Sequence, residues 1–308
     1  MIKRTLHFSN PAYLSLHLGQ MVIKFPSENG EERKTVTRPI EDIGIVIIES
    51  QAVTITSALL SELLANNVAV VTCDERHLPN GLLLNLDGNT LQTERFLAQI
   101  NASIPLKKQL WQLTVKQKIS NQAALLKHVN GVETGCMEVW SRNVKSGDSD
   151  NLEGRAAAYY WKNFFPDLPE FRRGQFEDAP NHLLNYGYSI LRGVIARSLV
   201  GSGLHPTLGI YHHNKYNSYC LADDIMEPYR PYVDKVVMNI GNLFGWATPI
   251  TKDVKKILLS IPTLDVVIDG LRRPLMVGAS ITTASLARCF MGEQRKISYP
   301  RIDENTFK

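Results

Sequence analysis

Cysteine is scarce in this chain of 308 residues, and the cysteines present form no motif. The four cysteines are scattered, and no two of them are spaced as a CxxC pair. This spacing argues against a zinc site or a disulfide framework and indicates reduced thiols in an intracellular protein. No apolar run is long enough to span a membrane, and the first residues lack the apolar core of a signal peptide. We therefore expect a cytoplasmic protein without a membrane partner.

A strong charge of one sign is also missing. The formal net charge is only +4, so binding to nucleic acid would need a local patch of basic residues. There is no P-loop, no GxGxxG sequence and no Ser-His-Asp signature. Basic residues do occur in short sets, which together suit a track for phosphates: Lys107-Lys108, Arg172-Arg173, Lys252 with Lys255-Lys256, Arg272-Arg273 and Arg295-Lys296.

The length predicts two domains, a β-rich domain over residues 1–89 and a helical domain over residues 90–308. Strands are predicted where apolar residues alternate or run together, at residues 14–18, 21–25, 43–48, 68–71 and 82–86. Thr56 can cap a helix that ends at Asn66-Asn67. The strands at 14–18 and 21–25 supply more edge than a small sheet can cover, so we expect this domain to pair two chains.

Helical patterns dominate the rest of the chain, which gives an α+β fold with a larger helical second domain. Pro105 can open a helix to about His128 whose apolar stripes are offset, so it kinks or packs on two sides. Asp150 or Asn151 can cap the next helix. Further helices are predicted at 180–199, 232–243, 251–259 and 274–289. The helix that Pro105 opens carries five lysines and no acid, which predict a basic exposed surface: Lys107, Lys108, Lys116, Lys118 and Lys127.

One histidine and several acids follow each other at suggestive spacings. His212 precedes Glu227 by fifteen residues, and Asp224 precedes Glu227 by three, which places both acids on one helix face. Glu153 lies upstream, at the start of another helical pattern. Two or three oxygen ligands with one nitrogen suit Mg²⁺ or Mn²⁺, the ions that assist phosphodiester chemistry.

Each of these residues also has a purely structural interpretation. His212 can be a surface or core histidine, and His205 and His213 compete with it. Glu153 in a first helical turn can serve the helix dipole. Asp224 and Glu227 can form a solvated face whose charge Arg230 neutralises.

Four segments in a fixed order carry a family resemblance: residues 151–161, 183–193, 203–212 and 221–230. Together they resemble the CRISPR-associated integrase, the nuclease of spacer acquisition that is the first of the numbered CRISPR-associated proteins. The resemblance covers nearly the whole chain and is strongest to members from type II systems.

The resemblance implies which residues hold the metal ion. In the family a ligand ends a tetrad of glycine, two apolar or aromatic residues and histidine, here Gly209 to His212. The implied ligands and catalytic residues are Glu153, His212 and Glu227, with Asp224 taking the third place in some branches. His205 replaces what is often an acid in the family, which leaves its role open.

The resemblance also implies an activity and its partners. The chain would insert captured DNA fragments into a CRISPR array, with a fragment's 3′-hydroxyl attacking a phosphodiester of the repeat and Mg²⁺ or Mn²⁺ as cofactor. Expected partners are double-stranded DNA, a second copy of the chain, a small ferredoxin-like CRISPR-associated protein that bridges two dimers, and type II effector and accessory subunits. The alternatives are a non-catalytic DNA-binding scaffold with a structural metal site and a structure-selective repair nuclease.

Overall fold

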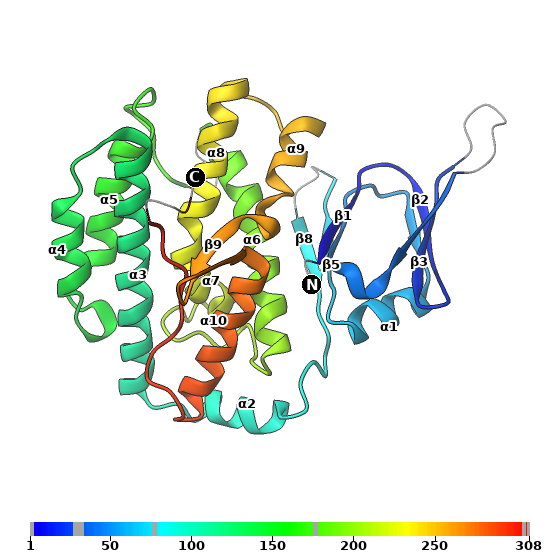
Figure 1. The fold of residues 1–308 in the computed structure, drawn as a ribbon, viewed down its shortest axis with the longest axis horizontal. Coiled ribbons are helices and arrows are strands. Elements are labelled where there is room, and N and C mark those ends of the chain that lie inside the picture. Colours follow the sequence, from blue (N-terminus) through cyan, green and yellow to red (C-terminus); the bar gives the residue numbers. More distant parts are fainter. Residues whose placement is uncertain (1–2, 27–33, 76–78, 175–177, 304–305, 307–308) are drawn as a thin grey trace. The chain divides into compact units, whose positions relative to one another are not determined.

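The computed structural model describes residues 3–26, 34–75, 79–174, 178–303 and 306. The chain divides into two compact units, Met1–Thr90 and Leu91–Lys308. The first unit is rich in strands and the second in helices (Figure 1), so the predicted α+β class is confirmed. None of the described helices is long and apolar enough to cross a membrane.

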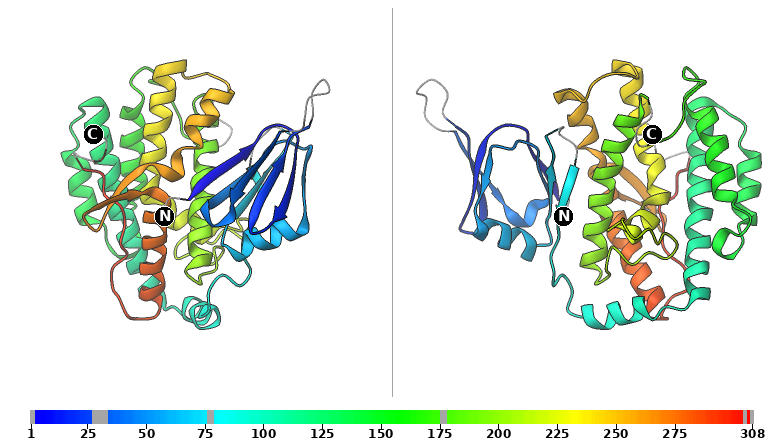
Figure 2. Two further views of the ribbon diagram at one scale, coloured as in Figure 1. Left: turned by 45° about the vertical axis from the view of Figure 1, so that its right-hand side comes forward. Right: turned by 180° about the vertical axis from the view of Figure 1, so that it is seen from behind.

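Two four-stranded sheets form the described part of the first unit (Figure 2). In one sheet three parallel strands are joined by an antiparallel fourth, in the order β1 (Arg4–Phe8), β5 (Ile43–Ile48), β7 (Ala69–Cys73) and β8 (Pro79–Leu83). The other has the order β4 (Thr35–Pro39), β3 (Gln20–Lys24), β2 (Ala12–His17) and β6 (Val53–Ile55). β5 is a continuous apolar run with five of its six residues buried, as expected for a strand with neighbours on both sides.

Helix α1 (Ser57–Ala65) completes the core of this unit. Thr56 caps it by accepting a hydrogen bond from the backbone N–H of Leu59 at 3.4 Å, as the sequence predicted. Leu59 and Leu63 lie four residues apart and are both fully buried, because that spacing puts them on one face. Their core cluster includes residues of both sheets, among them Leu14 and Ile43.

The edges expected to be open at residues 14–18 and 21–25 are mostly paired. β2 pairs with both β3 and β6, and β3 pairs with both β2 and β4. The predicted uncovered edge is therefore wrong for β3, which is paired on both sides along its length, whereas β6 covers β2 only over Ala12–Leu14. The pairing strands β4 and β6 have short or weakly apolar sequences that escape periodicity.

The described part of the second unit has nine α-helices. They are α2 (Gln92–Ile100), α3 (Ile104–Asn130), α4 (Gly135–Asn143), α5 (Leu152–Phe164), α6 (Asn181–Gly201), α7 (Cys220–Met226), α8 (Arg230–Phe244), α9 (Lys252–Leu258) and α10 (Leu275–Phe290). Short 3₁₀ turns, η2 (Ser146–Asp148) and η3 (Glu227–Tyr229), precede α5 and α8.

Helix α3 is the long element around which this unit is arranged. Ser103 caps its start by accepting from the N–H of Leu106 at 3.3 Å, and Gly131 ends it with a φ of 63°. It contacts α4, α5, η3 and α8, and α4 and α5 lie on one side of it with α8 on the other (Figure 1). This two-sided packing confirms the prediction made from the offset apolar stripes.

A two-stranded hairpin adds to the helices. β9 (Asp265–Ile268) and β10 (Leu271–Pro274) pair antiparallel. Asp269 and Gly270 join them with φ values of 49° and 77°, which is the backbone of a type I′ turn. The Asp-Gly dipeptide between apolar residues is a strong hairpin signal, and the sequence analysis did not use it.

A buried carboxylate links three helices of the second unit. Asp234 of α8 is 1% exposed, and the hydroxyls of Tyr160 of α5 and Tyr188 of α6 both donate hydrogen bonds to it. Burial raises the pKa of Asp234 to about 6 and outweighs the opposing effect of the two tyrosine hydrogen bonds.

We predict that this carboxyl gives stability a distinctive pH dependence. The folded state holds the Asp234 proton more tightly than the unfolded chain, whose pKa is about 4. The contribution of Asp234 to stability is therefore present below about pH 4 and is lost as the pH rises to about 6. Asp234→Asn cannot titrate, so its free energy of unfolding relative to the wild type should rise between pH 4 and pH 6 and then level off. Urea unfolding at several pH values measures this difference, and a difference that is constant across the window would contradict the prediction.

Candidate functional site

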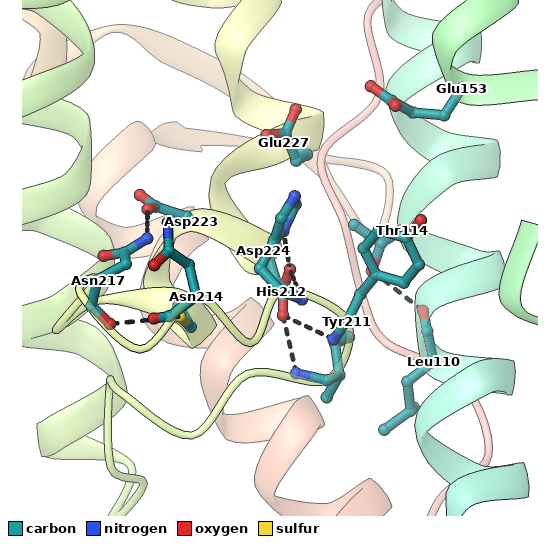
Figure 3. Close-up of polar contacts among 12 residues, drawn as sticks. Leu110, Thr114, Glu153, Tyr211, His212, Asn214, Asn217, Asp223, Asp224 and Glu227 are labelled. Carbon is teal, nitrogen blue, oxygen red and sulfur yellow. Dashed lines mark hydrogen bonds and ion pairs between the residues drawn. The ribbon is translucent and has the colours of Figure 1, made fainter. Parts of the chain in front are cut away.

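A buried carboxylate organises the loop between α6 and α7. The side chain of Asp224 of α7 is fully buried, and its Oδ2 accepts from the backbone N–H groups of Ile210 at 2.7 Å and Tyr211 at 3.0 Å. Its Oδ1 accepts from the N–H of His212 at 3.3 Å and pairs with Nδ1 of the same residue at 2.6 Å (Figure 3). A carboxylate that is taken out of water needs such donors. They fix the loop on α7.

Gly209 makes this close approach possible. A Cβ atom at this position would lie 2.3 Å from the carbonyl oxygen of His212 and 3.0 Å from Oδ2 of Asp224. The glycine of the Gly209 to His212 tetrad therefore has a steric reason, because any side chain would push the loop away from Asp224.

The bond to Asp224 also orients the imidazole of His212. Nδ1 donates to the carboxylate, so Nε2 is directed away from it. Trp111 of α3 and Tyr211 meet the ring edge-on, with centroids 5.6 and 5.2 Å away, and stack on each other at 4.2 Å. The hydrogen bond to Asp224 raises the pKa of His212 despite the opposing effect of burial. In Figure 3 the ring lies between Asp224 and Glu227.

Glu153 and Glu227 converge on a single cation. Lys118 of α3 donates a hydrogen bond to Oε1 of Glu153, in the first turn of α5. The same ammonium nitrogen lies 2.5 Å from Oε2 of Glu227, in η3. The side chains of Lys118 and Glu227 are only 10% and 9% exposed, and that of Glu153 is 28% exposed. Burial would lower the pKa of Lys118, but the two carboxylates raise it above its ordinary value.

Glu227 has a second cationic partner. Nε of Arg230 donates to Oε1 of Glu227 at 2.9 Å, so the neutralising role considered for Arg230 is present in the structure. Burial alone would raise the pKa of Glu227, but Arg230 and Lys118 lower it to about 2. Glu227 is therefore ionised throughout the physiological pH range.

The carboxylate of Glu153 does not cap the N-terminus of α5, because two other side chains do. Asp148 accepts from the N–H groups of Leu152 at 2.9 Å and Glu153 at 3.0 Å. Asn151, the N-cap, accepts from the N–H of Gly154 at 3.3 Å. Because these two side chains bind the free amides of the helix terminus, Glu153 is not needed there and turns to Lys118 instead.

The residues brought together fit a divalent cation, although they are not arranged as a metal site. No three His, Cys, Asp or Glu side chains of the described residues form one. However, the ammonium of Lys118 shows that Glu153 and Glu227 can share one cation. The contact of Oε2 of Glu227 with Lys118 is an ion pair that is not aligned as a hydrogen bond. Two carboxylates beside an imidazole whose other nitrogen binds a carboxylate are donors suited to Mg²⁺ or Mn²⁺.

The other acids and His205 have different surroundings. Asp224 points to the loop and to His212 as described. Asp223 accepts from Nε of Arg192 at 2.7 Å. The ring of His205 packs on Phe96 of α2 at 5.5 Å, and its backbone bonds to the side chain of Gln99. These contacts hold His205 against α2.

Sequence analysis missed the importance of Lys118. The expectation that it belongs to an exposed basic surface is wrong, since it is 8% exposed. Its spacing could have predicted the burial of Lys118, because Leu110, Thr114 and Lys118 follow each other at intervals of four on the buried face of α3. The capping role of Asp148 was not predicted, because its partners lie four and five residues further on, whereas an ordinary N-cap residue binds amides two or three residues further on.

Comparison with known proteins identifies the relatives of this chain. The family described as "CRISPR associated protein Cas1" matches residues 6–245. The "CRISPR-associated endonuclease Cas1" of Neisseria meningitidis serogroup C (strain 8013) is 37% identical over 260 residues, which cover 84% of this chain and 83% of that protein.

Solved structures show the same fold. A "Casposase bound to integration product" superposes with a TM-score of 0.76 at 20% identity, over 96% of this chain and 92% of that one. A chain of a "Cas6-RT-Cas1–Cas2 complex" gives a TM-score of 0.71 at 17% identity, over 96% of this chain and 36% of that one.

We predict that Lys118 competes with a metal ion for the two carboxylates. In Lys118→Met, the carboxylates lose a shared counter-ion, so in EDTA the free energy of unfolding should fall by roughly 3 kcal/mol. Mn²⁺ should then raise the melting temperature more than it does in the wild type, because no ammonium has to be displaced. Calorimetry in EDTA and across a Mn²⁺ titration at constant pH measures both effects. Lys127→Met changes an exposed lysine of the same helix and serves as the control. An equal Mn²⁺ response in Lys118→Met and the wild type would contradict the competition.

Proposed function

The chain belongs to the Cas1 family of CRISPR-associated proteins, and on this premise we propose that it is a metal-dependent DNA endonuclease and integrase. Its substrates would be a captured double-stranded DNA fragment and the repeat of a CRISPR array, into which the fragment is inserted as a spacer. Named endonucleases among the relatives and a casposase among the structural neighbours support an enzyme of this class. We place it in the cytoplasm of a prokaryotic cell.

One observation carries the proposal. Carboxylates from two separate elements, Glu153 of α5 and Glu227 of η3, share a single cation beside an imidazole that Asp224 orients. Side chains of like charge do not gather in a buried place unless a cation compensates them. We propose Glu153, His212 and Glu227 as the ligands of Mg²⁺ or Mn²⁺, with Asp224 as the residue that positions His212 and not as a ligand.

The reaction exchanges one phosphodiester for another. The oxygen of the fragment's 3′-hydroxyl forms a bond to phosphorus and loses its proton, while the bond to the 3′-oxygen of the repeat strand breaks and that oxygen gains a proton. The number of phosphodiester bonds is unchanged, so no ATP is needed. A bound divalent ion would neutralise charge on the reacting phosphate. The residues of the chain hold the ligands in place: Asp224 fixes the ring of His212, and the caps of α5 fix Glu153.

We expect Glu153→Gln, His212→Ala and Glu227→Gln each to lower metal-dependent strand transfer by at least about a hundredfold, because an oriented ligand is lost. The assay joins a labelled fragment to repeat DNA with saturating Mn²⁺ and with EDTA. Asp150→Asn changes an exposed acid three residues before Glu153 and should leave the rate unchanged. Full activity in any of the three variants would remove that residue from the site.

The same assay separates the alternatives. DNA binding that EDTA does not change, with no joined product in Mn²⁺, would support a non-catalytic scaffold. Metal-dependent cuts without joining at a repeat border would support a structure-selective repair nuclease.

We further propose that two chains pair through the strand-rich unit and that a Cas2-type protein bridges two such dimers, with type II effector and accessory subunits as further partners. The structural neighbour from a complex with Cas2 supports the bridging partner. The side chains of Tyr13 and Leu18 in the first unit are 54% and 86% exposed, which supplies apolar surface for a partner. Light scattering at micromolar concentration should give the mass of a dimer, and the mass of one chain would contradict pairing.

A further inference from the structure

A small cavity beside Glu227 is lined by three arginines. Its volume is about 280 Å³, and its walls come from the segment before α6, from α6 itself, and from α7 and the start of α8. The lining residues are Arg173, Asn185, Tyr188, Ser189, Arg192, Met226 and Arg230. None of these described lining residues is an acid, so the cavity presents cationic and neutral polar groups to whatever enters it.

One tyrosine holds two of the guanidinium groups. Those of Arg173 and Arg230 lie over the ring of Tyr188, at 5.1 and 4.5 Å from its centroid. Tyr188 is 6% exposed, and its hydroxyl donates to the buried Asp234. Planar guanidinium groups stacked on an aromatic ring are pre-organised and form hydrogen bonds at their edges. The cavity is therefore built before any ligand arrives.

Direct ion pairs involve two of the three guanidinium groups that line the cavity. Arg192 is paired with Asp223, and Arg230 with Glu227. Arg173 instead donates to neutral oxygens, to the carbonyl of Gly174 at 2.6 Å and to the side chains of Asn181 at 2.9 Å and Asn185 at 2.7 Å. Within the described part of the chain Arg173 forms no direct ion pair, although its charge acts on the buried carboxyl of Asp234 and lowers the pKa of that group.

We propose that this cavity binds one backbone phosphate of a DNA strand, next to the phosphodiester that reacts. Guanidinium groups match the oxygens of a phosphate, and three of them line this cavity of about 280 Å³. The inference rests on the proposed function, because the reacting strand is what brings the phosphate here.

Arg230 connects the cavity to Glu227, where the reacting phosphodiester would lie. It donates to Glu227 through Nε and lines the cavity as well. A strand held at the cavity would thus place its neighbouring phosphodiester beside Glu227. The cavity fixes the register of the strand and does not take part in bond exchange, so Arg173 is a positioning residue.

A binding cycle tests the proposal without any reaction. A series of DNA molecules each carries one neutral methylphosphonate linkage, placed at a different position near the repeat border. The affinity of the protein for each DNA is measured in EDTA. In the wild type one linkage should lower the affinity roughly tenfold or more, as expected for loss of a charge-assisted contact. In Arg173→Gln the unmodified DNA should bind roughly tenfold more weakly, with a salt slope smaller by about one phosphate contact, and neutralising that linkage should cost nothing further. Arg288→Gln, at an exposed arginine of α10, should behave as the wild type.

Two outcomes would overturn the proposal. One is that Arg173→Gln and every single neutral linkage weaken binding additively. The other is that inorganic phosphate alone stabilises the protein through Arg173 while the DNA cycle stays additive, which would make the cavity a site for free anions. If the cycle behaves as expected but Mn²⁺ supports no strand transfer by the wild type, the cavity stands and the proposed reaction fails.

Discussion

The burial of the Asp224 carboxylate is the constraint on which the rest of the site depends. An ionised group without access to water must be surrounded by donors, and here the donors are three backbone amides and the ring of His212. The loop that supplies them has no regular structure of its own between α6 and α7. Its shape is set by the need to satisfy one carboxylate, which also fixes where the imidazole lies.

A series of contacts also connects the buried Asp234 of the helical core to Glu227 of the site. Asp234 binds the hydroxyl of Tyr188, whose ring carries the guanidinium of Arg230, which in turn binds Glu227. The first two contacts join α6 to α8, and the third joins α8 to η3. The packing of the helices and the position of the Glu227 carboxylate are therefore parts of one arrangement, and a change in the core is transmitted to the site through few intermediates.

The sequence predicted those features that depend on neighbours along the chain. The cap at Thr56, the apolar run of β5 and the length of α3 all follow from local spacing, and the structure has them. The pairing of β2 with β6 and the burial of Lys118 depend on residues far away in sequence, which periodicity does not reveal. The tetrad that ends in His212 was recognisable as a motif, but only the structure gives the steric reason for Gly209.

The double ion pair of Lys118 has a consequence for the folding of the chain. The charges of Glu153 and Glu227 are balanced by two side chains that the protein carries itself, Lys118 and Arg230. Newly made protein can therefore complete its fold where free divalent metal is scarce, unlike small domains in which the metal supplies the folding free energy. If the proposed metal ion binds here, it would arrive at a chain that is already folded.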